Sequence, residues 1–230
     1  SYRGTDNTLI GWKEDFNMSF KSHIASQISA KEYLEKNEKK YPNKKIRIGG
    51  HSKGGNLAVY ASIFADSEVK KRIINVYNND GPGFNEDIIN TEEYKKSIEK
   101  VITYIPQDSI FGMLLNHEEK YTVVQSTQKG VMEHDVYSWQ VIGRNFVVLK
   151  EVTNGSKFID KTITNWLKNL DLQTREQVID IVFEIINSTE ARTIADLKLS
   201  LMKNAKIILS SYKHIEPENK KMITATITAL

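Results

Sequence analysis

The segment Gly49-Gly50-His51-Ser52-Lys53-Gly54-Gly55 constrains the fold more than any other part of the chain. It joins a short apolar run, Lys45–Gly50, which is typical of a strand, to the small-residue stretch 56–66, which has helical periodicity. Glycines stand two residues before and two residues after Ser52. A tight strand-to-helix turn requires them, because the flanking backbones approach too closely for side chains. The spacing matches neither common phosphate-binding pattern, G-x-x-x-x-G-K-[ST] or G-x-G-x-x-G.

A G-x-S-x-G pattern alone also arises by chance, so the prediction depends on the strand before it and the helix after it. With both present, we expect the nucleophile turn of an α/β-hydrolase, in which Gly50 and Gly54 allow the close approach and the Ser52 hydroxyl is exposed above the sheet. An accidental glycine loop is the alternative.

Apolar periodicity alternates strands and helices over about the first 150 residues, which favours an α/β fold with a mostly parallel sheet flanked by helices. The expected strands are Lys45–Gly50, Arg72–Asn78, Val101–Pro106 and Tyr121–Ser126, with a hairpin around 143–145. Amphipathic helices follow residue 154. We therefore expect an α/β-hydrolase core over 1–154 and a helical region over 155–230. The chain opens as if at the end of a strand, so we expect upstream strands to be missing.

Composition narrows the possible partners and cofactors. With 32 basic and 29 acidic residues the charge is nearly balanced, and we expect no nucleic-acid partner. The chain has no cysteine, which excludes disulfides, thiolate catalysis and sulfur-ligated zinc. We expect no metal and no cofactor. No apolar stretch is long enough to span a bilayer. We further expect a cytoplasmic protein, with a homodimer through the C-terminal helices as one possible assembly.

A serine hydroxyl needs a neighbouring base, and the chain offers five histidines. The order Ser, acid, His that is usual in α/β-hydrolases excludes His23. His51 stands inside the turn, and His214 lies in the helical region. His117 and His134 remain. We favour His134, because it lies in a loop after the last predicted strand.

Two aspartates could orient the base. Asp108 follows the third predicted strand and Asp80 follows the second, and active sites of open parallel sheets form at these strand ends. We expect Asp108, because its strand should neighbour the strand that leads to His134. Asp80 is the alternative acid, although an Asp-Gly pair is more often a plain turn.

Together these residues resemble the class 3 lipase branch of the α/β-hydrolases. The matching motifs are Tyr2-Arg3-Gly4-Thr5, then Trp12 and Asp15, then Gly50-His51-Ser52-Lys53-Gly54-Gly55. The resemblance implies that Thr5 and Lys53 supply the oxyanion-hole donors, and that Asp108 and His134 are the acid and base. The branch usually has Leu or Gln after the serine, so Lys53 is a departure.

The segments 77–84 and 134–139 extend the resemblance to an uncharacterised family of bacterial lipase-like proteins. The expected function is that of a serine hydrolase, an esterase or lipase-like enzyme working by acyl transfer through a Ser-His-Asp triad on a small acyl ester or a lipid. The alternative is a non-catalytic binding or membrane-surface module with the same fold.

Overall fold

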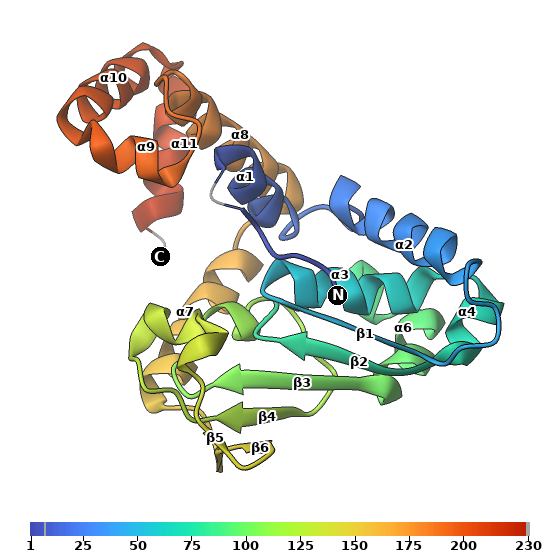
Figure 1. Cartoon of the computed structure of the whole chain (residues 1–230). Helices are drawn as coiled ribbons and strands as arrows, with labels where there is room; N and C mark the ends of the chain where they lie inside the picture. Colours follow the sequence, from blue (N-terminus) through green and yellow to red (C-terminus); the bar gives the residue numbers. More distant parts are fainter. Residues whose placement is uncertain (7, 229–230) are drawn as a thin grey trace. The chain divides into compact units, whose positions relative to one another are not determined.

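The apolar runs predicted as strands lie side by side in one sheet of the computed structural model, which describes residues 1–6 and 8–228 (Figure 1). The sheet has the order β1-β2-β3-β4-β7, with β1–β4 parallel and β7 antiparallel to β4. Their bounds are β1 Ile46–His51, β2 Ile73–Asn79, β3 Val101–Pro106, β4 Tyr121–Val124 and β7 Val148–Leu149. The expected α/β class with a mostly parallel sheet is confirmed.

The chain forms two compact units, which we call the core unit and the helical unit. The core unit contains Ser1–Gly4 and Ser22–Lys161, and the helical unit contains Thr5–Lys21 and the chain from Thr162. The sequence predicts the boundary between core and helical region at 154/155. Contacts instead place it inside α7 (Asn154–Lys168) and group residues 5–21 with the C-terminal helices. Residues 229–230 of the expected helical region lie outside the described part.

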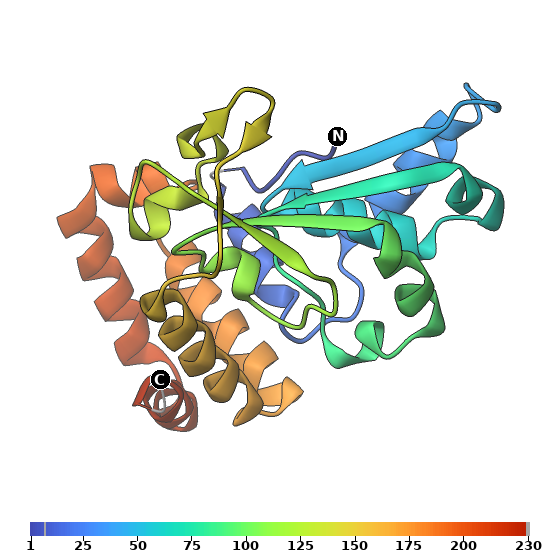
Figure 2. The ribbon, with the colours of Figure 1, turned by 90° about the horizontal axis from the view of Figure 1, so that it is seen from below.

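Three helices cover one face of the sheet in the core unit. Helix α3 (Lys53–Phe64) packs on β1 and β2, and α2 (Ala25–Glu38) and α6 (Glu92–Ser97) pack against α3. In Figure 2, β1 and β2 lie in front of α2 and α3, so these helices cover the far face. Along each strand, side chains therefore point alternately toward these helices and away from them. Fully burying an aliphatic side chain of this face stabilises the fold by roughly 1.5–3 kcal/mol. The buried members include Ile48, Leu57, Ala61, Ile63, Val76 and Val101.

Short elements connect the strands of the core unit. They are α4 (Ser67–Arg72), α5 (Glu86–Ile89), and the 3-10 turns η1 (Ile98–Lys100), η2 (Phe111–Met113), η3 (Gly130–His134) and η4 (Val136–Ser138). The predicted hairpin is present as β5 (Val141–Ile142) and β6 (Asn145–Phe146), with Gly143 at φ 63° in its turn. The chain after this turn is divided between β6 and β7, and β7 joins the main sheet.

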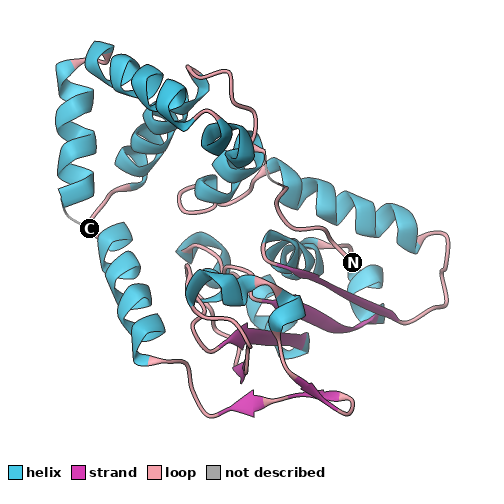
Figure 3. Ribbon diagram, turned by 60° about the vertical axis from the view of Figure 1, so that its left-hand side comes forward, coloured by secondary structure: helices cyan, strands magenta, loops and turns pink. Residues whose placement is uncertain are grey.

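The helical unit joins α1 (Leu9–Asn17) to the helices of the C-terminal region (Figure 1). These are α8 (Leu172–Asn187), α9 (Ile194–Leu199), α10 (Leu201–His214) and α11 (Pro217–Thr228). The chain that leads to the C-terminus is helical (Figure 3). The rings of Phe16 and Phe183 lie 6.0 Å apart, and Lys13 Nζ lies 2.7 Å from Asp180 Oδ1, which fixes α1 on α8. In the described part of the chain, every helix is too short or too polar to cross a membrane.

Candidate active site

Ser52 sits on the strand-to-helix turn that the glycine spacing predicts. It separates the last residue of β1 from the first residue of α3, with φ 57° and ψ −135°. This backbone conformation is strained for a residue with a side chain, and such strain clusters at functional sites. A Cβ on Gly50 would lie 2.2 Å from the carbonyl oxygen of Gly54. The turn therefore closes only because position 50 is glycine.

The N-terminal residues run beside this turn. The amide of Tyr2 donates to the carbonyl of Gly49 (2.9 Å), and its hydroxyl donates to the carbonyl of Ala30 (3.0 Å). A Cβ on Gly4 would lie 3.5 Å from Cβ of Ser52. The chain thus passes the nucleophile candidate just before it reaches Thr5.

The two residues expected to form an oxyanion hole lie in different units. Thr5 belongs to the helical unit, where its hydroxyl donates to Asp15 Oδ2 at 2.5 Å. Lys53 is the first residue of α3 in the core unit, and its side chain is buried. The first turn of a helix favours negative charge, because the helix dipole has its positive end there. The amide of Lys53 is therefore of the right kind for an oxyanion.

His134 meets Asp80, not the expected Asp108. Its Nδ1 atom lies 2.7 Å from Asp80 Oδ2, and the Asp80 side chain is fully buried. The other carboxylate oxygen accepts from Ser109 Oγ (2.5 Å) and from the amide of Gly112 (3.1 Å). Asp80 has φ 51°, and its amide donates to Tyr104. Asp80, directly after β2, thus places a carboxylate with hydrogen bonds to both oxygens against the imidazole.

Asp108, which follows β3, makes hydrogen bonds to other partners. One of its carboxylate oxygens accepts from the hydroxyl of Thr153, and the other from the amide of Gly130 at 3.3 Å. The expectation that Asp108 orients His134 is therefore wrong as regards the geometry. The reason is that its side chain closes the loops before η3 and α7.

A second buried carboxylate holds the backbone at His134. Glu133 is fully buried and accepts from Gln107 Nε2 (3.0 Å) and from the amide of Asp108 (2.9 Å). Its carbonyl accepts from the indole of Trp139 (2.9 Å). Burial raises the pKa of the Glu133 carboxyl. Sequence reasoning missed this residue, since a glutamate beside a histidine looks like loop surface.

The His134 ring contacts two other rings. Its centroid is 4.4 Å from that of His51 and 4.2 Å from that of Phe111. His51 Nε2 also lies 2.6 Å from the carbonyl oxygen of His134. A carbonyl only accepts, so this nitrogen carries a proton. Burial, with the nearby charge of His134, lowers the pKa of His51. The sequence does not favour His51 as the base, yet His51 contacts His134, the base candidate.

The loop that carries Asp80 is tied to the nucleophile helix. Asn56, fully buried in the first turns of α3, donates from Nδ2 to the carbonyls of Pro82 (3.1 Å) and Gly83 (2.9 Å). Its Oδ1 accepts from Gln27 Nε2 of α2 at 2.9 Å. All three hydrogen bonds are buried, so they fix the position of the loop after β2 relative to α3.

His117, the other base candidate, lies in a separate polar cluster. Its Nδ1 is 3.1 Å from Glu119 Oε1, which also accepts from the Thr103 hydroxyl at 2.9 Å. The hydroxyl of Tyr94 lies 3.4 Å from Glu119 Oε2. Although burial opposes it, the hydrogen bond and charge of His117 lower the pKa of Glu119 to about 2. The arrangement is that of a structural hydrogen-bonded cluster.

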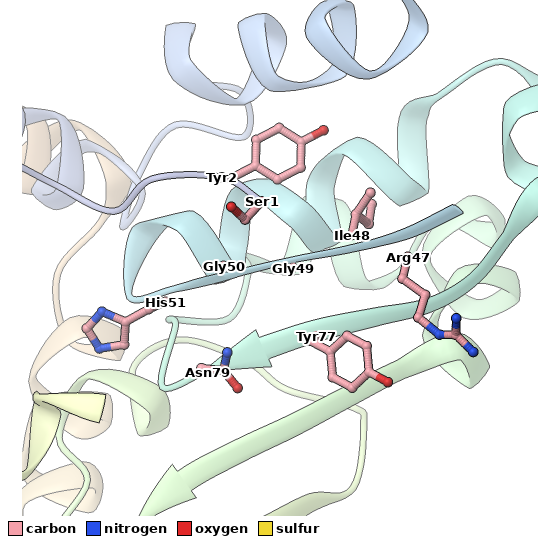
Figure 4. Close-up of a pocket in the computed structure, with 9 residues that line it drawn as sticks. All are labelled: Ser1, Tyr2, Arg47, Ile48, Gly49, Gly50, His51, Tyr77 and Asn79. Atoms are coloured by element: carbon pink, nitrogen blue, oxygen red, sulfur yellow. The ribbon is translucent and has the colours of Figure 1, made fainter. Parts of the chain in front are cut away.

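An open cavity of about 430 Å³ lies along β1 and β2 (Figure 4). His51 and Asn79 stand at the end nearest the turn, and Arg47 and Tyr77 stand at the other. Gly49 lies opposite Tyr77 in the strand register, and a Cβ on Gly49 would lie 2.8 Å from Cβ of Tyr77. Among the described residues, no group of three or more carboxylate or imidazole side chains is placed to hold a metal ion.

Comparison with known proteins gives one match. The model of the Mbeg1-like family matches residues 1–184, which takes in all the site residues described above. Comparison with curated proteins and with solved structures gave no match.

Proposed function

The chain belongs to the Mbeg1-like family, and from the geometry around Ser52 we propose that it is a serine hydrolase with an α/β-hydrolase core. The observation that carries the proposal is the hydrogen bond between His134 and the buried Asp80, in a chain that also has a strained serine turn. His51, which directly precedes Ser52, contacts the His134 ring, so the base candidate lies at the turn. The lipase-like resemblance of the motifs favours the same chemistry.

In the proposed reaction, Ser52 Oγ attacks the acyl carbon of an ester while His134 Nε2 takes the hydroxyl proton. Asp80 holds the other nitrogen, Nδ1, in its protonated form and stabilises the imidazolium. The same proton then passes to the departing alcohol as the acyl-oxygen bond breaks. Water repeats the sequence on the acyl-enzyme and releases the acid.

The oxyanion formed on attack needs donors close to Ser52. The amide of Lys53, at the start of α3, is the donor that we propose within the core unit. Loss of one such donor costs typically about 2.7–4 kcal/mol of transition-state stabilisation. His134 is about one-fifth exposed (21%), so a substrate can reach the imidazole. We propose a small acyl ester or a lipid as the substrate.

Hydrolysis of p-nitrophenyl esters of increasing acyl length tests the proposal. The wild type should hydrolyse at least the short esters, and Ser52→Ala should lose this activity while its thermal unfolding stays unchanged. Ser29→Ala, an exposed serine on α2, is the matched control and should retain full activity. Equal hydrolysis by Ser52→Ala and the wild type would reject the proposal. A folded wild type without activity would favour a non-catalytic binding module.

A further inference from the structure

We infer that His51 is a positioning residue for His134, holding the base in place from the nucleophile turn itself through a ring contact and a backbone hydrogen bond. The inference rests on the proposed function, in which His134 is the base. It assigns a role to the residue before the nucleophile, which the triad itself leaves without one.

The first support is geometric. The centroid of the His134 ring lies 4.4 Å from that of His51 and 4.2 Å from that of Phe111, with interplanar angles of 41° and 39°. Asp80 fixes Nδ1 at 2.7 Å. Two rings and one carboxylate thus contact the imidazole, and Nε2 is the nitrogen left for the serine. Without His51, the imidazole loses one of its two ring contacts.

The second support is the hydrogen bond from His51 Nε2 to the carbonyl oxygen of His134, at 2.6 Å. It crosses 83 residues of chain and joins the last residue of β1 to the last residue of η3. Ser52 follows His51 directly. The bond therefore sets the position of the base relative to the nucleophile through a single residue. A misplacement of about 1 Å at such a site can cost about 100-fold in rate.

The charge state of His51 suits this role. The charged and titratable groups that act on its ring are His134, Asp80 and Asp135. Burial, followed by the charge of His134, lowers the pKa of His51 below its ordinary 6.5. At neutral pH His51 is a neutral donor, so it orients the base without placing a second positive charge beside the imidazolium that forms during the reaction.

Two substitutions separate the two contacts. His51→Phe keeps a ring against His134 and removes the donor, while His51→Gln keeps an N–H donor and removes the ring. We expect each to lower kcat by about 10–100-fold with little change in KM, because positioning acts on the reacting atoms and not on substrate binding. The control is His23→Gln, which removes a ring contact and a hydrogen bond to Tyr60 away from the site. It should retain wild-type kcat and KM.

A spectroscopic measurement tests the inference without depending on catalysis. The proton on His134 Nδ1, shared with Asp80, should give a far-downfield ¹H NMR signal, assigned by its loss in Asp80→Asn. We expect the signal to shift or broaden in both His51 variants and to stay unchanged in His23→Gln. An unchanged signal together with wild-type kcat in both His51 variants would overturn the inference. If the wild type hydrolyses no ester, the proposed function fails, and the NMR signal still decides whether His51 positions the ring.

Discussion

Asp80 Oδ2 lies 2.7 Å from Nδ1 of His134, although 54 residues separate them in the chain. The carboxylate is fully buried, and Ser109 and Gly112 donate to its second oxygen. With both of its oxygens held by hydrogen bonds, the carboxylate is fixed in place and can hold the imidazole in one tautomer. This relationship assigns the acid of the proposed triad to the end of β2.

Replacement of the two candidate acids should therefore have unequal effects. We predict that Asp80→Asn lowers turnover of a p-nitrophenyl ester by about 10⁴-fold, because an amide can stabilise the wrong imidazole tautomer. Asp108→Asn should keep turnover within about tenfold of the wild-type value. It should lower stability instead, because Asp108 holds two loops together through Thr153 and Gly130. Steady-state kinetics of both variants, each with its melting temperature, measures the difference. A larger loss of kcat in Asp108→Asn would return the acid to β3.

The sequence predicts the turn at Ser52 but not the partner of His134, and the difference has a physical cause. The glycine spacing at positions 50 and 54 is a local requirement of the backbone, so it can be read from a few adjacent residues. The choice between Asp80 and Asp108 depends on donors 29 and 32 residues away from Asp80. An Asp-Gly pair is also common in ordinary turns, so the sequence favours Asp80 only as the alternative acid.

The grouping of residues 5–21 with the C-terminal helices could not be predicted from the sequence either. Their helix, α1, is one of the first elements in the chain, and no local signal assigns it to the C-terminal helices. The assignment comes from pairings such as the amide of Leu9 with the carbonyl of Arg192 at 2.9 Å and the bridge between Thr8 and Thr193. Contacts this distant in sequence leave no periodic pattern.

The turn at Ser52 should tolerate no side chain at position 50. We predict that Gly50→Ala destabilises the protein by more than about 4 kcal/mol or prevents folding, because its Cβ would lie 2.2 Å from backbone of Gly54. Gly155→Ala is the matched control. Its Cβ would have no neighbour closer than 3.7 Å, and alanine in a helix is favourable by up to about 1 kcal/mol. Urea unfolding compares them, and equal stability of both variants would contradict the close approach.

Asn56 should matter for stability as much as any core residue. We predict that Asn56→Ala lowers the free energy of unfolding by about 2–5 kcal/mol, because it leaves the carbonyls of Pro82 and Gly83 and the amide of Gln27 without their buried partner. Urea unfolding at neutral pH measures the loss. A change of less than about 1 kcal/mol would mean that water replaces the side chain at no cost.

The Glu119 cluster predicts how stability depends on pH. The folded-state pKa of about 2 lies below the ordinary 4.5, so the unfolded chain binds the proton at higher pH. The contribution of Glu119 is therefore complete above about pH 4.5 and is lost as the pH falls toward 2. We predict that Glu119→Gln is less stable than the wild type at pH 7 by about 1–3 kcal/mol, and that the difference shrinks through this window. Glu118→Gln, at an exposed neighbour, should show no such dependence, and a constant difference for Glu119→Gln would contradict the account.

Covalent labelling with a fluorophosphonate, followed by mapping of the modified peptide, tests the central claim most directly. Such a reagent reacts with a serine that a neighbouring base has activated. The account predicts one adduct on the peptide that carries Ser52, its absence in Ser52→Ala, and much slower formation in Asp80→Asn. A folded wild type that carries no adduct at Ser52, or carries it on another serine, would contradict the claim that Ser52 is the nucleophile of a triad with His134 and Asp80.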